Sequence, residues 1–150
     1  MKLSGKTIEF DNGLTFSIDD TFAETLKKVE SAEHDYEERV FISFKSHDAV
    51  KNIPTSVALC FYDDVDGITE IDVRFESSEY AGKKFDDFNE AAEFNKKLYQ
   101  ELRTYLLDQK LGNATEDDEN YLGIKTDTLF IGLSAGRSFE QVKMNISLNE

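Results

Sequence analysis

A serine between two glycines is the pattern in this chain closest to a catalytic motif. The segment Gly132-Leu133-Ser134-Ala135-Gly136 has the form Gly-x-Ser-x-Gly. In hydrolases this spacing exposes a serine nucleophile on a tight turn from strand to helix, because the flanking glycines avoid a steric clash. Both histidines precede the serine, and the chain ends soon after Gly136, at Glu150. The sequence therefore favours a structural turn at Ser134 over a catalytic serine.

The remaining candidates for nucleophilic or metal chemistry are one cysteine and two histidines, Cys60, His34 and His47. Zinc sites place such ligands at short spacings such as Cys-x-x-Cys, and the sequence contains none. Cys60 lies between two apolar residues, which is typical of a small thiol packed in a strand. There is also no glycine-rich phosphate loop. We therefore predict no catalytic residue, no metal site and no cofactor.

Acidic residues beside tyrosines form the pattern that carries a function prediction. Tyrosine supplies a large contact area at low entropic cost, and carboxylates complement Lys or Arg on a partner. The first such loop resembles the start of a calcium loop, but Tyr62 and Val73 fall where oxygen ligands are required. Solubilising loops are the alternative. The predicted partner-binding residues are Tyr62, Asp63, Asp64, Asp66, Glu116, Asp117, Asp118, Glu119 and Tyr121.

The overall charge constrains the partners of this chain. Its 150 residues include 31 acidic and 17 basic ones, a formal net charge of -14. Phosphate backbones are bound by clustered Lys and Arg, so direct nucleic-acid binding is not expected. The N-terminal segment lacks the apolar stretch of a secretory signal, and no run is long enough to span a membrane. We expect a cytoplasmic protein with one domain, residues 1–150.

Two strand hairpins are predicted from alternation of apolar and polar residues. In the first, a three-residue loop at 11–13 pairs Ile8 with Phe16, and Gly13 supplies the left-handed residue of the turn. In the second, a loop at 65–67 pairs Leu59 with Val73, and Phe61 with Ile71. Further strands are expected at 39–45, 128–133 and 141–148, with a short one at 121–124.

Two helices interrupt these strands. Thr21 and Glu24 have the spacing of a capping box at the start of the first helix. The second begins near Asp87, continues with an apolar stripe, and is expected to end at a Gly112 cap. The fold prediction is α+β: an antiparallel sheet of six to seven strands in the order ββαβββαββ(β), with both helices packed on one face.

In size, charge and α+β layout the chain resembles the acidic immunity proteins of bacterial toxin systems. No residue motif carries this likeness, so it transfers no functional residue. It implies a protein-binding inhibitor that neutralises a basic partner, such as a toxin or nuclease, by electrostatic occlusion. The alternative is a small enzyme or ligand-binding domain with a pocket between sheet and helices. A monomer or a homodimer paired along an exposed strand, the terminal one especially, is compatible with either.

Overall fold

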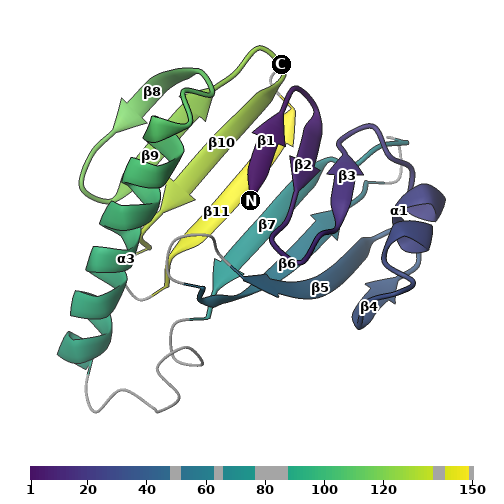
Figure 1. Cartoon of the computed structure of the whole chain (residues 1–150), viewed down its shortest axis with the longest axis horizontal. Helices are drawn as coiled ribbons and strands as arrows, with labels where there is room; N and C mark the ends of the chain where they lie inside the picture. The colour runs from purple at the N-terminus through teal and green to yellow at the C-terminus, as the bar shows by residue number, and fades with distance from the viewer. Residues whose placement is uncertain (48–51, 63–65, 77–87, 137–140, 149–150) are drawn as a thin grey trace.

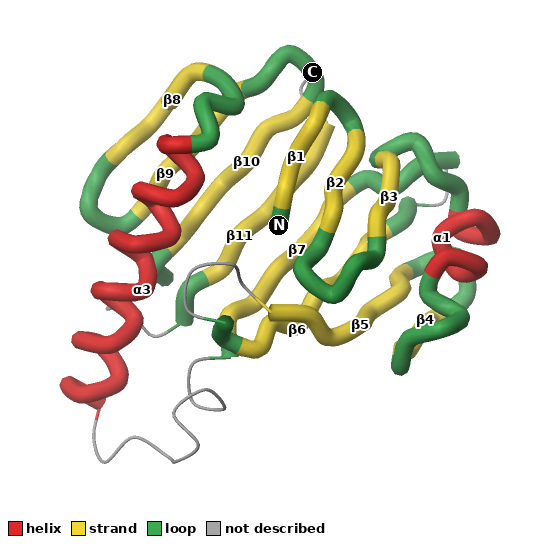
Figure 2. The backbone as a smooth tube through the Cα atoms, viewed as in Figure 1, coloured by secondary structure: helices red, strands yellow, loops and turns green. Residues whose placement is uncertain are grey.

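The structure is a computed structural model that describes residues 1–47, 52–62, 66–76, 88–136 and 141–148. Within them, the chain is an α+β protein with two antiparallel sheets and two helices (Figures 1 and 2). The small sheet contains β1 (Lys2–Ser4), β2 (Thr7–Glu9) and β3 (Thr15–Ser17). The helices are α1 (Phe22–Lys28) and α3 (Phe88–Asp108).

In the part of the chain that the structure describes, the large sheet has eight strands, and its two edges are β4 and β8. Its spatial order is β4 (His34–Glu37), β5 (Phe41–His47), β6 (Pro54–Cys60), β7 (Glu70–Phe75), β11 (Lys143–Leu148), β10 (Leu129–Ser134), β9 (Tyr121–Lys125) and β8 (Asn113–Asp117). The coarse class predicted from the sequence is therefore confirmed. The predicted strand count and the order ββαβββαββ(β) are wrong in detail.

The strands that the sequence did not predict are short and expose most of their side chains. β4 and β8 lie at sheet edges, where one side of each strand has no neighbour and apolar alternation is not required. β8 occupies part of the segment predicted as an acidic loop. The N-terminal hairpin also gains β1 and forms a separate sheet in place of joining the large one.

The first hairpin follows the prediction. Ile8 pairs with Phe16, the amide of Phe10 donates to the carbonyl of Leu14 at 2.9 Å, and Gly13 has a φ of 88°. A side chain at this φ would be strained, so the glycine permits the turn. The apolar side chains of the hairpin consequently share one buried face.

The register predicted for the second hairpin is wrong by two residues. Leu59 pairs with Ile71, and Val57 with Val73, so the buried face is the predicted one but the loop is longer. The cause is a tertiary contact: the Ile68 amide donates to the Ile18 carbonyl at 2.9 Å. A Cβ on Gly67 would approach that same oxygen to 2.8 Å, so a glycine allows the loop to lie against the end of β3.

Both predicted helices occur, but their ends were predicted with different accuracy. The capping box of α1 is confirmed, since Thr21 and Glu24 exchange side-chain and backbone hydrogen bonds of 3.1 and 3.2 Å. The expected start of the second helix at Asp87 lies outside the described residues. At the other end, Lys110 adopts the left-handed conformation predicted for Gly112, with a φ of 52°. Gly112 instead allows close approach to the Lys125 carbonyl.

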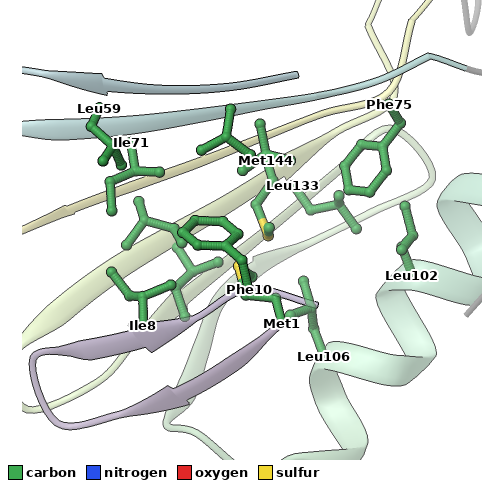
Figure 3. Close-up of a cluster of buried hydrophobic side chains, with 14 of the residues drawn as sticks. Met1, Ile8, Phe10, Leu59, Ile71, Phe75, Leu102, Leu106, Leu133 and Met144 are labelled. Atoms are coloured by element: carbon green, nitrogen blue, oxygen red, sulfur yellow. The ribbon is translucent and has the colours of Figure 1, made fainter. Parts of the chain in front are cut away.

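The core lies between the large sheet and a layer made of the small sheet and α3 (Figure 1). Alternate residues of the central strands point into this layer, as in β6, where every second side chain is buried. Figure 3 shows Met1, Ile8 and Phe10 meeting the sheet residues Leu133 and Met144, with the α3 leucines alongside. The N-terminal hairpin thus completes the core that α3 leaves uncovered.

The opposite face of the large sheet is not covered by any helix or strand that the structure describes. Many of its side chains are polar or small and partly exposed, including Ser43, Ala58, Asp72 and Asn145, and Tyr121 and Phe130 add two rings. Neither α1 nor α3 is long and apolar enough to span a membrane.

Candidate protein-binding surface

A group of partly exposed aromatic side chains gathers where α1, edge strand β4 and the loop after β6 meet. The Phe22 ring of α1 contacts Tyr36 of β4 with ring centroids 6.2 Å apart, and Phe61 with centroids 5.3 Å apart. Tyr36 is 52% exposed and Tyr62 57% exposed, unusual for large side chains. We call the surface formed by Phe22, Tyr36, Arg39, Tyr62 and Asp66 the β4 corner.

The β4 corner contains a shallow depression of about 320 Å³. Phe22 and Phe61 form its apolar part, and Arg39 and Asp66 form its charged rim. Arg39 adopts a left-handed φ of 61° in the turn between β4 and β5, which brings the rim to this place. The arrangement of an aromatic centre with a charged rim is the usual anatomy of a protein–protein interface.

Three carboxylates lie on or directly after edge strand β4. Asp35 and Glu37 flank Tyr36 in β4 and point to the opposite face of the strand, and Glu38 follows in the turn; all three are exposed. Among the described residues, none of these three side chains has a hydrogen bond or ion pair. Their charge is therefore available to a cationic partner.

Tyr62 and Asp66 from the predicted site thus belong to the β4 corner, whereas Asp63 and Asp64 lie outside the described residues. The Tyr62 hydroxyl donates to Glu70 at 3.3 Å, and the charge of this carboxylate raises the pKa of Tyr62. Sequence reasoning missed Phe22 and Tyr36. For Tyr36 the signal was present, because it lies between Asp35 and Glu37 in the same tyrosine-and-acid pattern.

The second predicted loop forms the β8–β9 turn, where two of the acidic side chains have internal partners. Arg103 of α3 donates two hydrogen bonds to Asp117, of 2.7 and 2.5 Å, which lower the pKa of that carboxyl. The Asp118 carboxylate accepts from the amides of Asn120 and Tyr121 at 2.8 and 2.9 Å and thereby shapes the turn. Glu116 and Glu119 remain exposed.

A buried tyrosine attaches this turn to the core. Tyr99 of α3 is 1% exposed, and its hydroxyl donates to the Asp118 carbonyl at 3.0 Å. Burial, and then the charges of Asp118 and Asp117, raise the pKa of Tyr99 to about 12. The hydroxyl therefore remains a donor throughout the physiological range.

The structure does not bring the two predicted loops together. The strand register aligns Tyr121 with Ser134, Lys143 and Arg74 in one row across the large sheet. The loop that contains Tyr62 lies at the opposite end of the strands, beyond the pair of Cys60 and Glu70. Four strand spacings also separate β6 from β9, about 19 Å. The predicted residues therefore divide between two surfaces.

Ser134 has no catalytic partner among the described residues. It ends β10, and its hydroxyl accepts a hydrogen bond of 3.1 Å from the Gly136 amide. The histidines lie on β4 and β5, several strands away, and none lines the surface depression around Ser134. The segment therefore behaves as the strand end and turn expected from the sequence.

Cys60 is also poorly suited to nucleophilic chemistry. Partial burial, followed by the charges of Asp72 and Glu70, raises its pKa to about 11. The thiolate is the reactive form, and it is scarce at neutral pH when the pKa is this high. No group of three potential metal-ligating side chains occurs in the described part of the chain.

The space between the large sheet and α3 holds a cavity of about 30 Å³, lined by Phe75, Leu102 and other core residues. This is room for one or two water molecules, far below the 300–1,000 Å³ of typical ligand pockets.

The terminal strand β11 lies inside the large sheet, so the expectation of pairing along it is wrong. Among the described residues, the edges of this sheet are β4 and β8.

Comparisons with protein-family models, with curated proteins and with solved structures find no match to this chain.

Proposed function

We propose that this chain is a protein-binding inhibitor of the immunity type, which neutralises a basic partner such as a bacterial toxin or nuclease by occluding its cationic surface. The observation that carries the proposal is the β4 corner, where Tyr36 and Tyr62 remain half exposed and the carboxylates of the same edge strand and its turn, Asp35, Glu37 and Glu38, have no internal partner among the described residues. Tyrosines commonly provide the central anchors of interfaces, and charged residues form the rim.

The tyrosines and the carboxylates have different roles in the proposed binding. Burial of the two tyrosine rings supplies affinity, because aromatic residues dominate interface energetics. Asp35, Glu37 and Glu38 supply long-range attraction and occupy the Lys and Arg side chains that otherwise receive phosphate. The net charge of -14 adds to the attraction at low salt.

The experiment measures association with a panel of basic nucleases by biolayer interferometry, together with inhibition of nuclease activity, at low and high salt. We expect binding to at least one member, with an association rate that falls steeply as salt rises. The Tyr36→Ala/Tyr62→Ala double variant should weaken that binding by about 30-fold or more, as loss of interface anchors does.

A pair of charge-matched variants locates the surface. Glu37→Gln/Glu38→Gln removes two charges at the β4 corner, and Glu116→Gln/Glu119→Gln removes two at the β8–β9 turn. We expect the first pair to slow association several-fold more than the second. Equal effects would show that only net charge matters, and salt-insensitive binding would rule out the electrostatic mechanism. Absence of binding and inhibition across the panel would count against the function itself.

A further inference from the structure

The uncovered face of the large sheet carries a second depression, of about 440 Å³, that the proposed function does not use. It extends over β9, β10, β11 and β7, on the side of the molecule away from the core. Its volume falls within the range of small-molecule sites. Ring-bearing, cationic and hydroxyl side chains all line it: Arg74, Tyr121, Phe130, Ser134 and Lys143.

Two glycines that pair across β9 and β10 leave room for the Tyr121 ring against the sheet. Gly123 and Gly132 are direct neighbours in the register and present no side chain to the uncovered face. The Tyr121 ring lies over both: a Cβ on Gly132 would lie 2.8 Å from the Tyr121 hydroxyl oxygen, and a Cβ on Gly123 would lie 3.2 Å from a ring carbon. The Tyr121 hydroxyl is thereby held over Gly132 on the floor of the depression.

Two cations stand side by side at the rim. Arg74 of β7 and Lys143 of β11 are direct cross-strand partners with exposed side chains. Like charges in this position repel each other. Within the described residues, neither side chain forms an ion pair or hydrogen bond, although acidic residues outnumber basic ones by 31 to 17 in this chain.

The carboxylates of Asp72 and Glu70, on the same face of β7 as Arg74, already have a hydrogen-bond partner. The Asn145 amide donates to Asp72 at 2.8 Å and also to Glu70, so both carboxylates have a partner in the adjacent rows of the sheet. Among the charged side chains that line the depression, Arg74 and Lys143 outweigh Asp72 and leave a net positive charge. An anionic group would relieve the repulsion between the two cations.

We propose that this depression binds a small organic anion, whose phosphate or carboxylate lies between Arg74 and Lys143 within reach of the Tyr121 hydroxyl. The remainder of the ligand would lie against the Tyr121 and Phe130 rings. Burial raises the pKa of Tyr121, and the charge of Glu116 adds to the effect, so the hydroxyl stays protonated and can donate to the anion. The proposal is independent of partner binding at the β4 corner, on the other end of the strands.

The test is an NMR titration of the full ¹⁵N-labelled chain at low ionic strength. The probes are phenyl phosphate, benzoate, inorganic phosphate and benzyl alcohol. We expect saturable shifts of the amides around Gly132, Ser134 and Lys143 with phenyl phosphate or benzoate, and the stronger of the two identifies the preferred anion. Inorganic phosphate should bind more weakly because it lacks the ring, and the neutral alcohol should leave these amides unchanged.

The matched variants are Arg74→Gln/Lys143→Gln and Lys45→Gln. Lys45 lies in the same row but donates to Ser56 at 2.7 Å, which in turn donates to Glu76. The double variant should weaken binding about tenfold or more, and Lys45→Gln should not. Lys143→Gln alone provides the same test if the double variant unfolds. Absence of saturation with every anion, equal binding of benzyl alcohol, or insensitivity to the cation variants would overturn the proposal.

Discussion

The β8–β9 turn and the β4 corner both place acidic residues beside a tyrosine, and they differ in what those residues contact. At the turn, Asp117 pairs with Arg103, Asp118 accepts backbone amides, and Tyr99 anchors the segment from below. At the corner, Tyr36 and Tyr62 are half exposed and the neighbouring carboxylates of Asp35 and Glu37 have no partner among the described residues. The same composition therefore serves the fold in one region and remains available to a partner in the other.

The largest effect expected from this comparison is on stability. Tyr99→Ala removes a buried ring and the hydrogen bond to Asp118, so we expect the free energy of unfolding to fall by about 3–5 kcal/mol. Tyr62→Ala at the β4 corner removes a mostly exposed ring and should change it by less than about 0.5 kcal/mol. Urea unfolding of both variants measures the difference. Similar losses would mean that the two regions are equally structural.

A smaller effect is expected at Tyr121, through its contact with the glycine pair. Tyr121→Ala uncovers the backbone of Gly123 and Gly132, and we expect a loss of about 1 kcal/mol. Gly132→Ala should also destabilise the protein, because the new methyl group meets the tyrosine hydroxyl. In the Tyr121→Ala background, however, Gly132→Ala should be neutral or stabilising, and a double-mutant cycle of unfolding free energies measures this coupling. Additive losses would contradict the contact.

The smallest effect concerns the Arg103–Asp117 pair, because about a third of each side chain is exposed. Arg103→Gln should reduce the free energy of unfolding by less than about 1 kcal/mol at neutral pH. The Asp117 pKa is lower in the folded chain than its usual 3.8, so the contribution is complete above that value. It is lost as the pH falls through the folded-state pKa.

We therefore measure the free energy of unfolding of wild type and Arg103→Gln from pH 7 to pH 2. The difference between the two should stay constant and disappear only below about pH 4. Lys6→Gln removes the more exposed pair with Asp19 and provides the control, with a smaller change expected at every pH. A gap that persists at pH 2 would mean that Arg103 stabilises the turn by packing alone.

The parts of the fold that were predictable from sequence are those where local pattern and local structure coincide. Gly13 and the alternation around it determine the first hairpin, and the Thr21–Glu24 capping box begins α1. The second hairpin has the same alternation, but the contact of Ile68 with Ile18 lengthens its loop and shifts its register. A contact between residues 50 positions apart leaves no local pattern.

The candidate site was predictable only in part for the same reason. Tyr62 and Asp66 were identified from their loop, whereas Phe22 and Tyr36 join them only when α1 packs against edge strand β4. In the acidic run at 116–119, the sequence does not reveal that Asp117 pairs with Arg103 of α3 or that the Tyr99 hydroxyl donates to the Asp118 carbonyl. The depression with Arg74 and Lys143 likewise depends on the order of strands distant in the chain.

The acidic edges of the large sheet have a consequence for how this protein tolerates high concentration. Unpaired strand edges can pair with the same edges of other copies of the chain and form ordered aggregates. Here Asp35 and Glu37 lie on one edge strand and Glu116 on the other, so two copies brought edge to edge meet with like charge. Acidification neutralises that repulsion. The protein should therefore stay dispersed at neutral pH and begin to scatter light as its carboxylates are protonated.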